Sequence, residues 1–413
     1  MSAAPDDPGN AVAWQDRPAA SRLSFALILA LAMGTGTYAG YAFGVLGPHL
    51  IDEFEISRFQ LGLLTTCFFL VGGPLSLVAG RATDRFGARR VMLVSFGISA
   101  LATIAMAIAP AYPAMLLAAA AAGLGLAAGN PVTNKLIAIH LPPGRRGLVM
   151  GGKQAGVQVG AFLAGALLAP LAVQIGWREA LAWSAVVPAL GLAIALLIVP
   201  GDRGLHADAG SSLDASDRAL PAGVRWLTAY AFLMGSGIAA INAYLPLYLV
   251  ERGGAAPELA GAVVATIGLV GIFSRVAWGW ASERMPTFTL PLLLLGIGAV
   301  VAIGLVLAIE RLGLWLAWPA AALIGATAVT WNAVGNLAVI TESGSRLAGR
   351  ATGLLTFGFY LGFVGSPMVF GLVVDGLGSY PLAWSLVAAI FAATVVVVLG
   401  WRRNSALKAR LLP

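Results

Sequence analysis

Long apolar stretches alternate with short polar ones along almost the whole chain. A membrane-spanning helix needs about 20 predominantly apolar residues, and twelve stretches reach that length. The sequence therefore predicts an all-α membrane protein with twelve transmembrane helices. The expected spans are approximately Leu23–Pro48, Phe59–Ala79, Val91–Ala109, Pro113–Ile139, Leu148–Val173, Glu179–Val199, Trp226–Val250, Glu258–Ala281, Thr289–Ile309, Leu314–Ile340, Ala351–Val374 and Pro381–Trp401.

Composition agrees with this pattern and excludes several classes of protein. Of the 413 residues, 59% are hydrophobic, and the mean hydropathy is +0.88, whereas soluble domains rarely exceed about half apolar residues. The net charge of +7 is scattered over short loops, so it does not indicate a nucleic-acid partner. Cys67 is the only cysteine, so we expect no internal disulfide, no thiol metal site and no cofactor.

The basic residues predict an orientation. Of the 25 Lys and Arg residues, eighteen fall on one side of the expected membrane and four on the other, and three lie inside spans. Short loops rich in Lys and Arg stay inside the cell. We therefore expect an integral protein of the bacterial inner (plasma) membrane with both termini in the cytoplasm.

A charged stretch, Gly80 to Arg90, separates the second and third apolar runs. It holds four arginines and Asp84 in a chain of which only 10% of residues are charged. We predict a loop, in which Gly87 permits a turn that a side chain would oppose and Asp84 gives the arginines a local anion. The pattern Gly-x3-Asp-Arg-x-Gly-x-Arg-Arg resembles the loop between spans 2 and 3 of major facilitator superfamily transporters.

The second half of the chain echoes the first at offsets of 199 to 202 residues. Short glycine, asparagine and charged motifs recur, among them Gly80-x3-Asp84-Arg85 as Gly279-x3-Glu283-Arg284. They indicate two pseudo-symmetric six-helix bundles, the architecture that the resemblance also implies. The expected divisions are a tail (1–22), a bundle (23–199), a linker (200–224), a second bundle (225–401) and a second tail (402–413).

The resemblance implies that the charged stretch takes part in gating. Asp84 is expected to face the cytoplasmic start of span 11 near Ala351, where free backbone N–H groups attract a carboxylate. The arginines are expected to fix the loop and bind anionic lipid headgroups, or to act only as topology signals. The residues assigned to gating are Gly80, Asp84, Arg85, Gly87, Arg89, Arg90, Gly279, Glu283 and Arg284.

Inside the spans the sequence places cations but no acids. No carboxylate lies in the middle of any span, whereas Lys135, Lys153 and Arg275 lie within spans. A charge at the centre of a span costs about 2.5–3.5 kcal/mol, which an anionic substrate would offset. Arg275 suits a carboxylate because a guanidinium donates two parallel hydrogen bonds. For each cation the alternative is a side chain that reaches back to the cytoplasmic surface.

Uncharged polar residues accompany these cations at helical spacing. They either line a central cavity or form hydrogen bonds between helices. Spans 1, 4, 7 and 10 line the cavity in the family that the charged stretch resembles. The expected substrate-binding residues are Arg275, Lys153, Tyr38, Tyr41, Asn130, Gln154, Gln158, Asn242, Tyr244, Asn332 and Tyr360.

These patterns favour a secondary transporter that works by alternating access. The expected substrate is a small organic anion such as a monocarboxylate, with proton coupling and a monomeric protein. The segments around Asn130–Lys135 and Gly152–Gly156 resemble bacterial carriers of the cyanate-permease type. The alternatives are export of drugs or hydrophobic metabolites and a sensor or scaffold descended from a transporter. The sequence has no phosphate loop and no HExxH, so neither an ATP-driven pump nor an enzyme is expected.

Overall fold

The computed structural model describes residues 19–140, 146–199 and 220–411, and within these ranges the chain is helical without strands. The α-helices are α1 Ala19–Val45, α2 Gly47–Phe54, α3 Arg58–Phe86, α4 Ala88–Ala107, α5 Tyr112–His140, α6 Arg146–Leu163, α7 Ala169–Ile175, α8 Trp177–Ser184, α9 Val186–Ile198, α10 Ala222–Glu251, α11 Pro257–Arg284, α12 Thr289–Leu312, α13 Ala317–Ala326, α14 Trp331–Leu377 and α15 Tyr380–Leu411. A π-helical turn, Ala164–Leu168, joins α6 to α7, and 3₁₀ turns at Leu314–Leu316 and Ala328–Thr330 flank α13.

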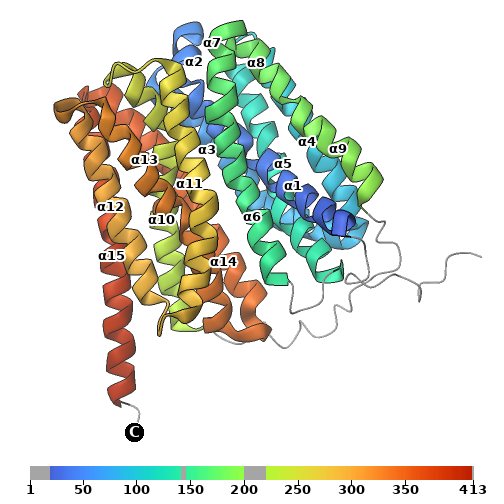
Figure 1. Ribbon diagram of the computed structural model, residues 1–413, viewed down its shortest axis with the longest axis vertical. Helices are drawn as coiled ribbons and strands as arrows, with labels where there is room; N and C mark the ends of the chain where they lie inside the picture. The colour runs from blue at the N-terminus through green and yellow to red at the C-terminus, as the bar shows by residue number, and fades with distance from the viewer. Residues whose placement is uncertain (1–18, 141–145, 200–219, 412–413) are drawn as a thin grey trace, which may run out of the picture.

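The twelve predicted spans are confirmed. Twelve stretches of the described helices are long and apolar enough to cross a membrane. Several are interrupted: span 5 contains the π-helical turn, and span 10 is divided between α13 and the first part of α14. Span 11, Ala351–Leu377, is the second part of α14, which folds back beside the first (Figure 1).

The helices form two bundles, one of α1–α9 and one of α10–α15 (Figure 1). Within the first, α3 packs against α5 and α1 against α6; within the second, α10 packs against α14 and α12 against α15. The bundles meet where α3 contacts α14 and where α6 contacts α11. We call the face where α15 ends the terminal side, and the face that carries α2 the opposite side (Figure 1).

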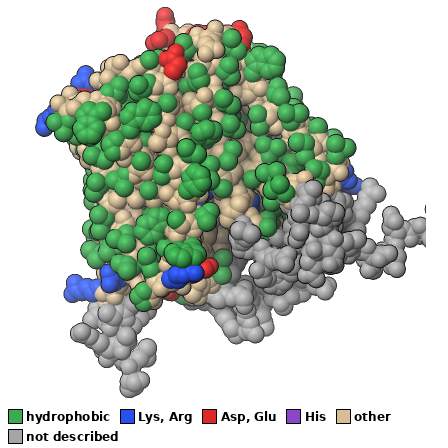
Figure 2. Space-filling view, viewed as in Figure 1, with side chains coloured by type: hydrophobic (Ala, Val, Ile, Leu, Met, Phe, Trp, Pro, Cys, Tyr) green, Lys and Arg blue, Asp and Glu red, His purple; other side chains and the backbone are tan. Residues whose placement is uncertain are grey.

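The lateral surface is apolar, as a bilayer requires. Hydrophobic side chains cover the sides of the molecule, and charged side chains lie mostly towards its ends (Figure 2). Leu197, for example, is 86% exposed and Leu101 73%. In a bilayer these side chains would face hydrocarbon and not water, so their exposure costs little free energy.

The charged stretch differs from the predicted loop. Residues 80–86 continue α3, and only Gly87 stands between α3 and α4. Residues 81–86 contain neither glycine nor proline, so no residue of this segment ends the helix before Gly87. The turn predicted at Gly87 is confirmed by its φ of +91°, a conformation that favours glycine.

Candidate functional site

Arg275 lies buried between the two bundles, on α11. Its side chain is 6% exposed. Nη1 donates to the main-chain carbonyl of Gln154 on α6 (2.5 Å), and Nη2 donates to the carbonyl of Val329 in span 10 (3.0 Å). Its Nε is buried and has no partner. The guanidinium therefore points into the protein and keeps a free donor there.

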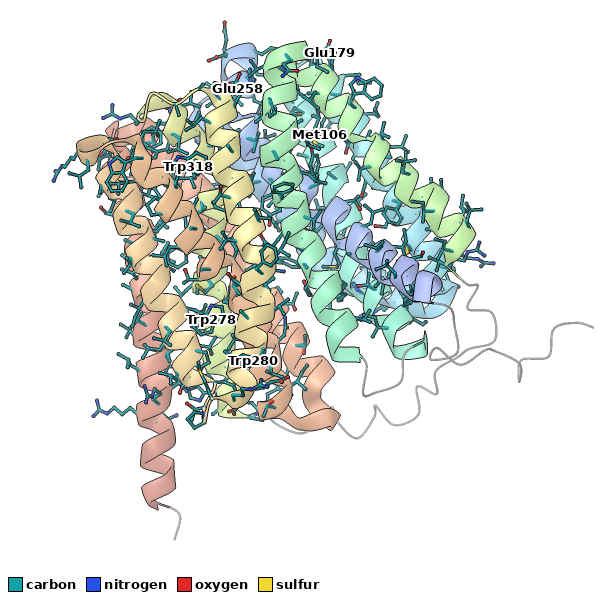
Figure 3. The ribbon with its side chains drawn as sticks, viewed as in Figure 1. Met106, Glu179, Glu258, Trp278, Trp280 and Trp318 are labelled. Carbon is teal, nitrogen blue, oxygen red and sulfur yellow. The ribbon has the colours of Figure 1, made fainter. Side chains whose placement is uncertain are left out.

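The carbonyl of Val329 is available because span 10 is broken at this level. Helix α13 ends at Ala326, and α14 begins only at Trp331. Backbone carbonyls at such a break lack helical partners and need other donors. Trp278, one turn after Arg275 and labelled in Figure 3, donates from Nε1 to the carbonyl of Ala326 (2.9 Å). Two side chains of α11, Arg275 and Trp278, thus donate hydrogen bonds to carbonyls between α13 and α14.

Lys153 lies on α6 and is 1% exposed. Its ammonium donates to Asn130 Oδ1 (3.2 Å), Thr133 Oγ1 (3.0 Å) and Asn134 Oδ1, all on α5. An ammonium has three donors and no acceptor, so these three uncharged oxygens match it fully. Lys153 therefore does not reach to the surface.

One further contact connects Lys153 with Arg275. Gln154 Nε2 lies 3.4 Å from Asn130 Oδ1, which also accepts from Lys153. The Tyr360 side chain on α14 lies close to Asn130 as well. We call the connected set the polar network. It consists of Asn130, Thr133, Asn134, Lys153, Gln154, Arg275 and Tyr360.

The polar network carries two positive charges without a described anion. Among the side chains that the structure describes, neither Lys153 nor Arg275 forms an ion pair. Their partners are carbonyl, amide and hydroxyl oxygens. These accept hydrogen bonds but do not neutralise the positive charge. A pair of buried cations in a low-dielectric interior strongly attracts a negatively charged ligand.

Two buried acceptors near this network also lack partners. Gln158 Oε1 and Asn332 Oδ1 have none. A Cβ at Gly271, one turn before Arg275 on α11, would lie 3.1 Å from Gln158 Oε1, so Gln158 borders the same stretch of α11. Tyr41, 9% exposed, lies near the guanidinium of Arg275.

Four other residues from the sequence analysis lie outside the network. Tyr38 Oη is 2.8 Å from Ser184 Oγ. Tyr244 Oη lies 2.6 Å from the carbonyl oxygen of Arg58 and 2.8 Å from that of Pro367 on the opposite side, and its single proton can be donated to either. The main chain of Asn242 packs closely against Gly44. Lys135 Nζ donates to the carbonyl of Thr83 (2.8 Å), near the end of α3. The hydrogen bonds of Tyr38, Tyr244 and Lys135 join neighbouring helices.

The expected gating residues surround the ends of α3 and α11. Arg89 Nη2 donates to the carbonyl of Leu196 on α9 (2.7 Å), which fixes the start of α4. The guanidinium of Arg85 lies 5.3 Å from the Phe86 ring, and that of Arg284 lies 3.9 Å from the Trp280 ring. Arg90 and Glu283 are exposed, and a Cβ at Gly80 or Gly279 would meet no atom within 4 Å. The side chain of Asp84 lies outside the described residues.

The expected substrate-binding residues omit three groups of the site: Thr133, Asn134 and the carbonyl of Val329. Thr133 falls between Asn130 and Asn134 on the same face of α5, so its spacing from Asn130 could have revealed it. No sequence pattern predicts that the carbonyl of Val329 is free to bind Arg275. The carbonyl is free because the helix is broken between Ala326 and Trp331, and the sequence of this span is one continuous apolar run.

Comparison with known proteins places the chain among transporters. The family model of the Major Facilitator Superfamily matches residues 26–367. The 3-(3-hydroxy-phenyl)propionate transporter of Escherichia coli is 28% identical over 229 residues, which is 54% of this chain and 56% of that protein; this match therefore spans about half of each. A protein of Cupriavidus necator named as a probable sulfoacetate transporter is 24% identical over 84% of this chain and 86% of its own length.

A solved structure has the same fold. The bacterial homologue of the human lysosomal transporter Spinster, in an inward-facing and unoccupied conformation, superposes with a TM-score of 0.71 at 18% identity. The match covers 93% of this chain and 96% of that one.

Proposed function

Because the chain belongs to the major facilitator superfamily, we propose that this secondary transporter carries a small organic anion across the membrane by alternating access. The two relatives described above are named for organic anions, 3-(3-hydroxy-phenyl)propionate and sulfoacetate. Their names support an organic anion as the class of substrate, and the two buried cations of this chain support it independently.

One observation carries the proposal: two buried cations in the polar network have no described counter-ion, and Arg275 retains an unused buried donor. A carboxylate or sulfonate beside Arg275 would accept from Nε and offset the charge of the guanidinium. Lys153, bound by uncharged oxygens alone, would add to the positive potential at that point. Export of hydrophobic compounds would give these two cations no role.

The partnerless acceptors suggest what else the substrate carries. Gln158 Oε1 and Asn332 Oδ1 are buried without donors, which costs about 1–3 kcal/mol for each unsatisfied group. A substrate hydroxyl, or the proton of a protonated acid group, would satisfy either one. A proton that enters with the anion would also reduce the net charge that crosses the membrane, so proton symport fits the site.

The test is uptake of a panel of small carboxylates and sulfonates, with and without hydroxyl groups, into right-side-out vesicles. Arg275→Ala should abolish accumulation of the transported anion because the carboxylate loses its donors. Arg311→Ala, which removes an exposed arginine at the end of α12, should leave uptake unchanged. Both variants should elute as the wild type does on size exclusion. Undiminished uptake by folded Arg275→Ala would remove Arg275 from the site and refute the proposal.

A further inference from the structure

The opposite side of the molecule is closed by an acidic residue of one bundle on a helix start of the other. Asp375 is the third residue from the end of α14. Its Oδ1 accepts from the main-chain N–H of Arg58 (3.2 Å) and its Oδ2 accepts from that of Phe59 (2.7 Å). These are the first two residues of α3, where free N–H groups and the helix dipole favour a carboxylate.

The side chain of Arg58 adds a second connection at the same place. It donates to Glu251 at the end of α10 through Nε (3.2 Å) and Nη2 (2.9 and 3.0 Å), and its Nη1 lies 3.8 Å from Asp375 Oδ1. Tyr380 Oη, at the start of α15, donates to Glu251 Oε2 (2.7 Å). Groups from α10, α14 and α15 thus converge on the first residue of α3.

Below this cluster α3 and α14 are in close contact. A Cβ at Gly62 on α3 would lie 2.6 Å from the carbonyl oxygen of Pro367, and one at Gly371 on α14 would lie 2.6 Å from Phe59 Cα. Thr66 Oγ1 donates to the carbonyl of Val364 (2.7 Å). Backbones approach this closely only where residues are small.

The two helices diverge towards the terminal side. On α3, a Cβ at Gly73 would still meet Tyr360 Cβ at 3.2 Å, whereas one at Gly80 would meet no atom within 4 Å. The same holds for Gly353 near the start of span 11. Among the residues that the structure describes, the two helices are therefore in close contact at the start of α3, and no atom comes near Gly80 or Gly353 at the other end.

The positions of the acids at the two ends correspond. Asp84 is the third residue from the end of α3, as Asp375 is the third from the end of α14. Since α3 and span 11 run in opposite directions, each helix ends beside the start of its neighbour, on opposite faces of the membrane. We propose that Asp375 is a cap of its own on the opposite side: it caps α3 when that side is closed, and it alternates with the cap of span 11 that the family resemblance implies for Asp84.

The proposal gives the two acids opposite effects on one equilibrium. Rocking of two rigid bundles about the contacts between them closes one face while it opens the other, so only one cap is made at a time. Loss of the Asp375 cap should favour the state that is open on the opposite side. Loss of the Asp84 cap should favour the state seen here, and loss of both should restore the balance.

The experiment measures distances between spin labels in the full chain, without substrate, so its outcome does not depend on the anion. In a Cys67→Ser background, one label pair replaces Ile108 and Leu312 on the opposite side, both exposed (70% and 66%). A second pair replaces Leu197 and Pro286, exposed on the terminal side. Asp375→Asn should raise the ratio of long to short Ile108–Leu312 distances about fivefold and shorten the Leu197–Pro286 distances.

Matched variants make the result decisive. Asp84→Asn should shift both distributions the other way, and the double variant should lie near the wild type. Asp52→Asn, which changes an exposed acid of α2 on the same face as Asp375, should change neither. The proposal is overturned if Asp375→Asn leaves both distributions as in the wild type, or if the two single variants shift them in the same direction.

Discussion

At the scale of single residues, the two buried cations are bound in different ways. All three partners of Lys153 lie on α5, within its own bundle, so they stay in place when the bundles move. Arg275 is bound across the bundles, to the carbonyl of Gln154, and this bond must break when the bundles separate there. Under the proposed function we therefore expect Lys153 to act as a fixed source of positive potential and Arg275 to change its partner during transport.

The fixed charge of Lys153 leads to a prediction about affinity. Lys153→Met keeps the length of the side chain but removes the charge, and it should raise the KM for the transported anion about tenfold or more because the site loses positive potential. Vesicle uptake measured over a range of concentrations checks this. Lys135→Met, which loses a bond to the Thr83 carbonyl outside the polar network, should leave the KM unchanged. An unaltered KM in Lys153→Met would show that its charge does not act on the substrate.

Glu53 on α2 gives a prediction about pH. Burial opposes its ionisation, but hydrogen bonds from Arg178 (2.9 and 2.6 Å) and from Trp177 outweigh it and hold the pKa of this carboxyl below its usual value of 4.5. A lowered pKa stabilises the folded protein above pH 4.5, and this stability is lost as the pH falls through the folded-state pKa. The unfolding temperature of Glu53→Gln should therefore lie below that of the wild type at pH 7.

This difference should shrink as the pH falls below 4.5. Unfolding in detergent, followed at several pH values, measures it. Asp52→Asn, a neighbour on α2 that is exposed, should show a small difference that does not vary in this way. A gap between Glu53→Gln and wild type that stays constant with pH would contradict the assignment.

At the scale of helices, the sequence determines the spans but not their interruptions. The length of the apolar stretches alone predicted the twelve spans, because a helix needs about 20 apolar residues to cross the hydrocarbon core of a bilayer. The break at Ala328–Thr330 and the π-helical turn at Ala164–Leu168 depend on contacts between spans, which no local pattern carries. The same limit applies to the site. Arg275, Lys153 and Gln154 were predicted because burying a polar side chain in a span is costly, and all three belong to the polar network. No local pattern predicted that the hydroxyl groups of Tyr38 and Tyr244 bond to neighbouring helices.

Close packing of α6 on α1 gives a matched pair of predictions. A Cβ at Gly156 would lie 2.6 Å from the carbonyl carbon and 2.8 Å from the Cα of Ala30, whereas one at Gly152, one turn earlier, would meet nothing within 4 Å. Backbone atoms cannot move aside as a side chain can, so Gly156→Ala should destabilise the protein by about 1–3 kcal/mol. Gly152→Ala should be neutral or slightly stabilising. Unfolding temperatures in detergent compare the two, and equal values would show that α1 and α6 are not packed as described.

At the scale of the whole molecule, two features describe one state of a transport cycle. The opposite side is tied by Arg58, Glu251 and Asp375, while α3 and α14 separate towards the terminal side. Between these levels lies the polar network, with Arg275 bonded across the seam. Under the proposed mechanism, a substrate anion would reach the network from the terminal side, so the orientation of the protein decides which compartment this state faces.

The orientation is predicted from charge and can be measured directly. On the topology expected from the sequence, eighteen of the 25 Lys and Arg residues fall on the same side as the termini, so both termini should lie in the cytoplasm. Green fluorescent protein fused after Pro413 should fluoresce, and alkaline phosphatase fused after Pro110, in the turn between α4 and α5 on the opposite side, should be active. The reciprocal fusions should be inactive, since each reporter works in only one compartment. If the fusions gave the reverse pattern, the basic residues would face outward, and the state described here would be open to the exterior and not to the cytoplasm.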